Sequence, residues 1–131
     1  MGAWGPGSFE NDDAMDWLDG LARGHGATPI RDALSAAAES DGYVEAPEAS
    51  AALAAAEVVA ALHDRPCVGL PEEAAGWVRT HRGAAQPWML DMARCAVDRV
   101  ERDSELRDAW LESGDAGEWE TAVRELRSRL R

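Results

Sequence analysis

Apolar residues recur every three or four positions through nearly all of the chain, which is the spacing of a helix face buried against a core. The first stripe is formed by Ala14, Trp17, Leu18 and Leu21, and a strongly periodic segment follows Pro87. No segment of useful length alternates between apolar and polar residues as a half-buried strand does. The pattern therefore predicts helices and no β-sheet.

Cap-forming residues, prolines and glycines divide the periodic segments into six or seven helices. The predicted helices start near Asn11, Thr28, Pro47, Pro71, Pro87, Ser104 and Asp115, and we expect Asn11, Thr28, Ser104 and Asp115 to be the N-caps of their helices. Asp115 and Glu118 have the spacing of a capping box, and Glu125 and Arg129 have the i,i+4 spacing of an ion pair within one helix. Connections of roughly two to eight residues favour antiparallel packing of successive helices. We therefore expect an all-α fold: one compact domain over residues 1–131, a bundle of six or seven short helices with mostly antiparallel neighbours, and a Gly-rich segment 1–10 packed on the bundle.

The charge balance restricts the classes of partner. The chain of 131 residues has 25 acidic and 13 basic residues, a formal net charge of −12. Residues 1–65 carry twelve acids and three arginines, whereas residues 66–131 carry thirteen acids and ten arginines. Such a surface repels nucleic-acid phosphates and anionic membranes. We expect neither as a partner, and we expect a basic partner protein to be attracted to the first half.

Several features of the sequence bear on its compartment. All thirteen basic residues are Arg, and Ala is abundant, as in proteins encoded by GC-rich bacterial genes. No apolar run approaches the roughly 20 residues of a membrane span, and no signal peptide is visible at the start. Two cysteines form no disulfide framework. We expect a cytoplasmic bacterial protein.

The opening segment is the most distinctive part of the sequence. Three glycines within six residues precede the cap residue Asn11, and such loops can bind anions before a helix N-terminus. Here the acidic residues that follow occupy that position. We favour a loop that folds back to bury Trp4 and Phe9, with an anion site as the alternative.

Two further groups of carboxylates are candidate sites. Asp12, Asp16 and Asp19 lie along one side of the first helix, where they form either a solvated face, which we favour, or part of a cation site. Glu57 is flanked by alanines and valines, and its burial stays open because alanines are easily exposed. A buried Glu57 would need a partner, for which Arg94 or the amides of the opening loop are candidates.

Other signals of chemistry are weak. The three histidines are far apart, and no nucleophile, dinucleotide or phosphate-loop motif is present. We expect no catalytic residues, no metal and no cofactor. Six tryptophans are many for this length, and most coincide with the apolar stripes. Trp88, which follows Pro87 at a helix start, is the candidate for an exposed partner anchor.

The opening residues Gly2 to Trp17 follow the pattern G-A-W-G-x-G-x-F-E-N-D-x-A-x-D-W. With Glu45-Ala46-Pro47-Glu48, Ala54-Ala55-Ala56-Glu57 and the later Ser104-Glu105-Leu106, this pattern resembles a family of small bacterial proteins described as a domain of unknown function, DUF4259. The resemblance covers nearly the whole chain. It implies a stand-alone bacterial domain and assigns no residue a role.

These observations leave three functional hypotheses. The leading one is a non-enzymatic acidic domain that binds another protein with a basic surface, for example as an immunity-like or regulatory protein. The alternative is a metal-dependent hydrolase that gathers Asp12 or Asp16, Glu57 and Asp91 around a metal. A third is a homodimer formed through a helix face.

Overall fold

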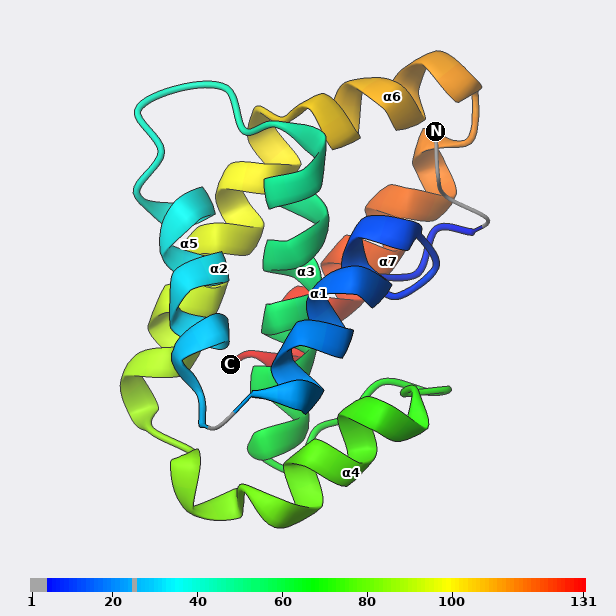
Figure 1. Ribbon diagram of the computed structural model, residues 1–131. Coiled ribbons are helices and arrows are strands. Elements are labelled where there is room, and N and C mark those ends of the chain that lie inside the picture. The colour runs from blue at the N-terminus through cyan, green and yellow to red at the C-terminus, as the bar shows by residue number, and fades with distance from the viewer. Residues whose placement is uncertain (1–4, 25) are drawn as a thin grey trace.

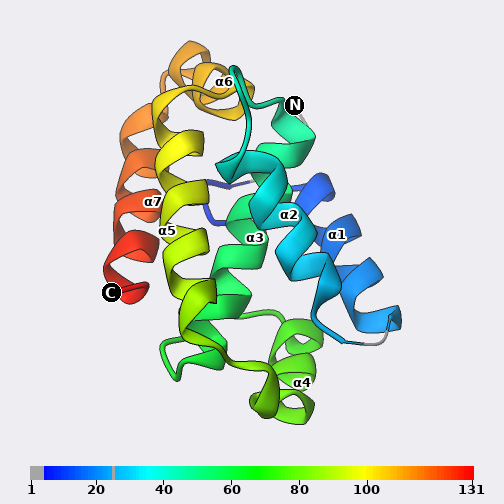
Figure 2. The same cartoon turned by 90° about the vertical axis from the view of Figure 1, so that its left-hand side faces the viewer.

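The computed structural model describes residues 5–24 and 26–131, and within these ranges it confirms the all-α fold. The described part of the chain forms seven α-helices, whose arrangement is shown in Figures 1 and 2. They are α1 (Asp12–Arg23), α2 (Thr28–Ala38), α3 (Ala46–Leu62), α4 (Glu72–Thr80), α5 (Pro87–Arg102), α6 (Glu105–Ser113) and α7 (Ala116–Arg129), with a short 3-10 helix η1 (Arg82–Ala84) before α5. None of the helices described is long and apolar enough to cross a bilayer.

Helix α3 runs through the middle of the bundle and packs against each of the other six helices. Figures 1 and 2 show α6 across its N-terminal end and α4 at its C-terminal end. Thirteen of its 17 residues are buried, and alanine is the commonest among them. A helix that is apolar on all sides belongs in a core, and small side chains let its neighbours approach closely. The remaining helices therefore form a shell around α3.

The predicted caps are confirmed at two helices and are wrong at two others. The side-chain oxygens of Asn11 and Ser104 accept hydrogen bonds from Ala14 N and Arg107 N, at 2.8 and 3.0 Å. Helix α2 starts at Thr28, so the cap position is held by Ala27. Asp115 has a non-extended backbone (φ −106°, ψ 22°), and Glu118 N therefore donates to its backbone carbonyl in place of the predicted capping box.

The connection before α3 is tied to the junction of α5 and α6. Val44 N donates to the carbonyl of Asp103, and Glu105 N donates to the carbonyl of Val44, which gives an isolated parallel β-bridge. The Glu105 carboxylate accepts a further hydrogen bond from Ala46 N at 2.8 Å. A carboxylate at this position satisfies a free amide at the N-terminus of α3 and interacts favourably with the helix dipole.

The described part of the opening segment, residues 5–10, folds against the bundle. Phe9 is buried with 8% of its surface exposed, and Glu10 accepts a hydrogen bond from Gly7 N at 2.9 Å. Side chains at Gly5 or Gly7 would collide with the Glu10 carboxylate. The expected burial of Trp4 lies outside the described residues.

Candidate binding cleft

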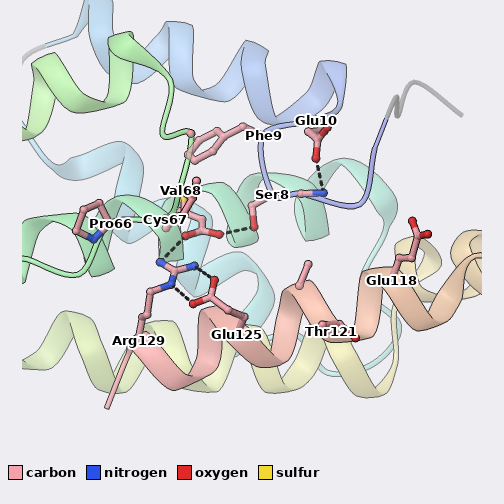
Figure 3. Close-up of a pocket in the computed structure, with 14 residues that line it drawn as sticks. Ser8, Phe9, Glu10, Pro66, Cys67, Val68, Glu118, Thr121, Glu125 and Arg129 are labelled. Carbon is pink, nitrogen blue, oxygen red and sulfur yellow. Dashed lines mark hydrogen bonds and ion pairs between the residues drawn. The ribbon is translucent and has the colours of Figure 1, made fainter.

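A cleft of about 870 Å³ opens where the opening segment, α3, the loop after α3 and α7 come together. Figure 3 shows the residues that line it. Ser8, Phe9 and Glu10 come from the opening segment, Glu57 from α3 and residues 66–69 from the loop. Sequence segments that are far apart thus supply its walls.

Helix α7 forms one wall with a single polar stripe. Glu118, Thr121, Ala122, Glu125 and Arg129 face the cleft at helical spacing. The neighbouring face of α7 is apolar and lies in the core, together with the residue that follows the helix: Trp119, Val123, Leu126 and Leu130. Small side chains at the centre of the polar stripe leave room between the carboxylates on either side of them.

Glu57 is buried at the inner end of the cleft, with 4% of its surface exposed. Its Oε2 accepts a hydrogen bond from Ser8 Oγ at 2.8 Å. Its Oε1 lies 2.9 Å from Nη1 of Arg129 but off the direction of the N–H bonds, so this contact is an ion pair without a directed hydrogen bond. Our prediction that Arg94 or the loop amides would be the partner of a buried Glu57 is wrong; the partners are Arg129 and the side chain of Ser8.

Arg129 is shared by two carboxylates. Its Nε and Nη2 donate to Glu125 at 2.5 and 2.8 Å, and its Nη1 also donates to the backbone carbonyl of Arg65 at 3.1 Å. Burial lowers the pKa of Arg129, but the hydrogen bonds to Glu125 and the negative charges of Glu125 and Glu57 outweigh that effect and raise the pKa above its usual value. The guanidinium is therefore a permanent cation at the inner end of the cleft.

The cleft as a whole is acidic. Four carboxylates line it, those of Glu10, Glu57, Glu118 and Glu125, against one guanidinium. Glu118 is exposed near the outer end and forms an ion pair with no residue in the described part of the chain. Val68 stands on the rim with its side chain fully exposed. This combination of negative charge and apolar surface suits a ligand that is cationic and partly apolar.

Cys67 lines the cleft without the properties of a nucleophile. Burial, aided by the negative charge of Glu57, raises the pKa of its thiol to about 11. The thiol is therefore protonated near neutral pH, whereas the thiolate is the reactive form.

The residues needed by the hydrolase hypothesis are not brought together. Asp12 and Asp16 are exposed on α1, and Asp91 pairs with Arg94 on the outside of α5. Arg94 also donates to the carbonyl of Leu130 at 2.5 Å, at the end of α7. Glu57 lies apart from them in the cleft. Within residues 5–24 and 26–131, no three His, Cys, Asp or Glu side chains are grouped so that they would hold a metal ion.

Trp88 is exposed as expected, with 40% of its surface accessible at the start of α5. The guanidinium carbon of Arg31, from α2, lies 5.8 Å from the centre of its ring. A cation over an indole face is attracted by the ring electrons, so Arg31 holds the side chain against α2. This contact is separate from the cleft.

Comparison with known families adds one result. A family model described as a domain of unknown function (DUF4259) matches residues 2–122. The chain belongs to DUF4259. No curated protein and no solved structure matched it. The matched residues include Ser8 and Glu57, while Glu125 and Arg129 lie beyond them.

Sequence reasoning named Glu57 but missed the wall of the cleft on α7. Glu125 and Arg129 were interpreted as a helical i,i+4 pair, and Glu118 as part of a capping box. The available signal was the spacing of Glu118, Glu125 and Arg129 on one face, next to an apolar face that must be buried. That spacing predicts that the three side chains point to the same side of the helix, but it does not reveal that Glu57 of α3 lies on that side.

Proposed function

We propose that the DUF4259 domain is a non-catalytic protein-binding module whose cleft receives a basic segment of a partner protein. The observation that carries this proposal is the composition of the cleft, where four carboxylates and one guanidinium line about 870 Å³ beside the exposed Val68. The net charge of −12 extends the same preference over the whole surface and accelerates encounter with a cationic partner.

The size and lining of the cleft favour a peptide segment over a single small ion. Pockets of roughly 300–1,000 Å³ accommodate ligands much larger than one functional group. Apolar atoms of Phe9, Pro66 and Val68 lie beside the carboxylates, so the aliphatic stem of an arginine or lysine has apolar surface to cover.

The inner end of the cleft already shows how a cation is held. The Arg129 guanidinium donates two hydrogen bonds to the Glu125 carboxylate and forms an ion pair with Glu57, and an incoming arginine would need a carboxylate contact like that of Glu125. Glu118, nearer the outer end, offers a similar carboxylate to a partner. Catalysis has no support from these groups, since Glu57 is engaged by Ser8 and Arg129 and the Cys67 thiol is protonated near neutral pH.

We place this interaction in the bacterial cytoplasm. An immunity-like protein that neutralises a basic effector is one example of a molecule with this charge and this cleft. A regulatory subunit for a basic enzyme would use the same physics. Both versions predict binding that weakens with salt, mainly through slower association.

The test is site-specific photo-crosslinking in a bacterial host. A photoreactive amino acid replaces Val68, whose exposed side chain tolerates substitution, or Leu111 on α6, which is 45% exposed and lies outside the cleft. We expect a partner that crosslinks at position 68 through a segment rich in Arg or Lys and does not crosslink at position 111. Identical crosslinks at both positions would contradict the proposal.

Affinity for the captured partner is then measured with matched charge variants. Glu118→Gln should weaken binding about two- to five-fold and reduce its salt dependence, as expected for one rim charge. The control is Glu73→Gln, which removes an exposed glutamate from the first turn of α4, outside the cleft. Equal effects of the two variants would show that only the overall charge matters and that the cleft is not the site.

A further inference from the structure

A second hollow lies between α1, α2 and α3, in the first half of the chain. It measures about 380 Å³ and is lined by Trp17 of α1, by Pro29, Ala33 and Ala36 of α2, and by Ala51 of α3. Asp32 and Glu48 stand at its edges. None of these residues lines the acidic cleft, so the groove is a separate surface.

The groove is preformed. The Trp17 indole N–H donates to the backbone carbonyl of Pro29 at 3.3 Å, which fixes the ring as one wall. The remaining walls carry alanine methyl groups, whose small size is what leaves the volume. Because the walls are set by packed helices, an occupant does not have to order them on binding.

The charges around the groove define its occupant. Asp32 and Glu48 are exposed, and within the described residues neither forms an ion pair. They belong to the half of the chain with twelve acids and three arginines. An apolar hollow between two carboxylates is complementary to an apolar side chain that is flanked by cations.

We propose that this groove docks an apolar side chain presented by a basic amphipathic helix of a partner protein. In helix-in-groove recognition an amphipathic helix lays apolar side chains into a hollow, and basic residues on the same helix would then meet the carboxylates of Asp32 and Glu48. A second copy of this chain is a poor occupant, because two surfaces of net charge −12 repel each other. The inference does not rest on the function proposed for the cleft.

The test uses a synthetic 16-residue helical peptide with a leucine stripe flanked by arginines, and a matched peptide with glutamates in place of the arginines. The readout is the Trp17 indole N–H signal in ¹H–¹⁵N spectra, assigned with a Trp17→Phe variant. We expect a saturable shift with the basic peptide, no shift with the acidic one, and weaker binding at higher salt.

Two substitutions of alanine by leucine test whether the peptide binds in the groove. Ala36→Leu fills the groove from an exposed position and should weaken binding at least tenfold. Ala22→Leu, at an exposed position of α1 that does not line the groove, should leave binding unchanged. Equal effects of the two variants, or equal shifts with both peptides, would overturn the proposal.

Two further outcomes would identify another occupant or another site, and either would overturn the proposal that the groove docks a basic helix. Loss of peptide binding in Glu118→Gln would place the peptide in the acidic cleft. A concentration-dependent dimer in light scattering, abolished by Ala36→Leu, would make a second copy the occupant.

Discussion

Arg129, the last residue of α7, lies with its Nη1 2.9 Å from Oε1 of Glu57, in the middle of the central helix α3. The side chains are 14% and 6% exposed, so the pair is largely removed from water. Ser8 holds the other oxygen of the same carboxylate. One buried carboxylate thus connects the opening segment, the central helix and the C-terminal helix.

Removal of the cation from this pair should be costly. Arg129→Met leaves the Glu57 carboxylate buried without a compensating charge, and we expect the free energy of unfolding to fall by about 3 kcal/mol. Urea denaturation followed by circular dichroism measures this change. A loss below about 0.5 kcal/mol would show that water replaces the guanidinium at no cost.

Two companion variants separate the buried pair from the surface pair. Glu57→Leu combined with Arg129→Met removes both charges, and we expect it to recover most of the lost stability. Glu125→Gln disrupts the i,i+4 pair with Arg129, in which the Glu125 side chain is 55% exposed. It should cost less than about 1 kcal/mol.

Ser8→Ala should loosen the opening segment. The hydroxyl of Ser8 donates to an ionised, buried acceptor, and such hydrogen bonds contribute about 1.5–3 kcal/mol. We expect a loss near the lower limit, since Ser8 is half-buried, together with faster amide exchange in residues 5–10. Ser128→Ala is the control, because this exposed serine bonds a carbonyl of its own helix. Unchanged exchange in residues 5–10 would contradict a role of Ser8 in holding the segment.

The elements of the fold were predictable because their signals are local. Prolines precede or open α3 and α5, Asn11 and Ser104 cap α1 and α6, and each outer helix has one apolar stripe. These signals act within one or two helical turns of the residue that carries them. They locate the helix starts to within a few residues and, for the outer helices, identify the face that is buried.

The burial of Glu57 was left open by the sequence for a non-local reason. Helical periodicity assigns one face to the core, and on α3 that face excludes Glu57. The structure surrounds α3 with six helices, so every face is covered. The run from Ala49 to Leu62 is apolar on all sides, and that property indicated a central helix more directly than its periodicity did.

The partner of Glu57 could not be predicted from local signals either, because it lies far away in the sequence. Arg129 is 72 positions away from Glu57 in sequence. The i,i+4 spacing of Glu125 and Arg129 already assigned Arg129 a local partner in an exposed helical ion pair. Arg94 was the expected partner, but Asp91 lies one turn before it and binds its guanidinium. The pair of Glu125 with Arg129 was thus predictable from spacing, whereas the contact of Arg129 with Glu57, which joins α7 to α3, was not.

Tyr43 should titrate at unusually high pH. Its hydroxyl donates to Asp108 Oδ2 at 2.6 Å, and this hydrogen bond, aided by the surrounding negative charges, raises the pKa of Tyr43 from 10.0 to about 12. Tyr43 is the only tyrosine in the chain, so absorbance at 295 nm reports it alone. We expect a midpoint near 12 in the folded protein and near 10 in urea.

The direction of the effect on stability follows from the same shift. The folded state holds the Tyr43 proton more tightly than the unfolded state, so the contribution to stability is complete below pH 10 and is lost as the pH rises from 10 towards 12. Asp108→Asn should move the midpoint towards 10. A midpoint that does not respond to this variant would exclude Asp108 as the cause.

Cys67 should react more slowly with disulfide reagents than the exposed Cys95. Burial, together with the negative charge of Glu57, raises the pKa of the Cys67 thiol from 9.0 to about 11, which lowers its thiolate fraction at pH 8 about 100-fold. A more basic thiolate is a better nucleophile, with a Brønsted coefficient of about 0.4–0.5, so roughly a tenfold deficit remains. Cys95→Ser and Cys67→Ser isolate the two thiols in an assay with 5,5′-dithiobis(2-nitrobenzoate), and urea should make the two reaction rates equal.

Because the Glu57 charge also raises the pKa of Cys67, Glu57→Gln should increase the reaction rate of Cys67 and leave that of Cys95 unchanged. Equal reaction rates for the two thiols in the folded protein would refute the burial of Cys67 in the cleft.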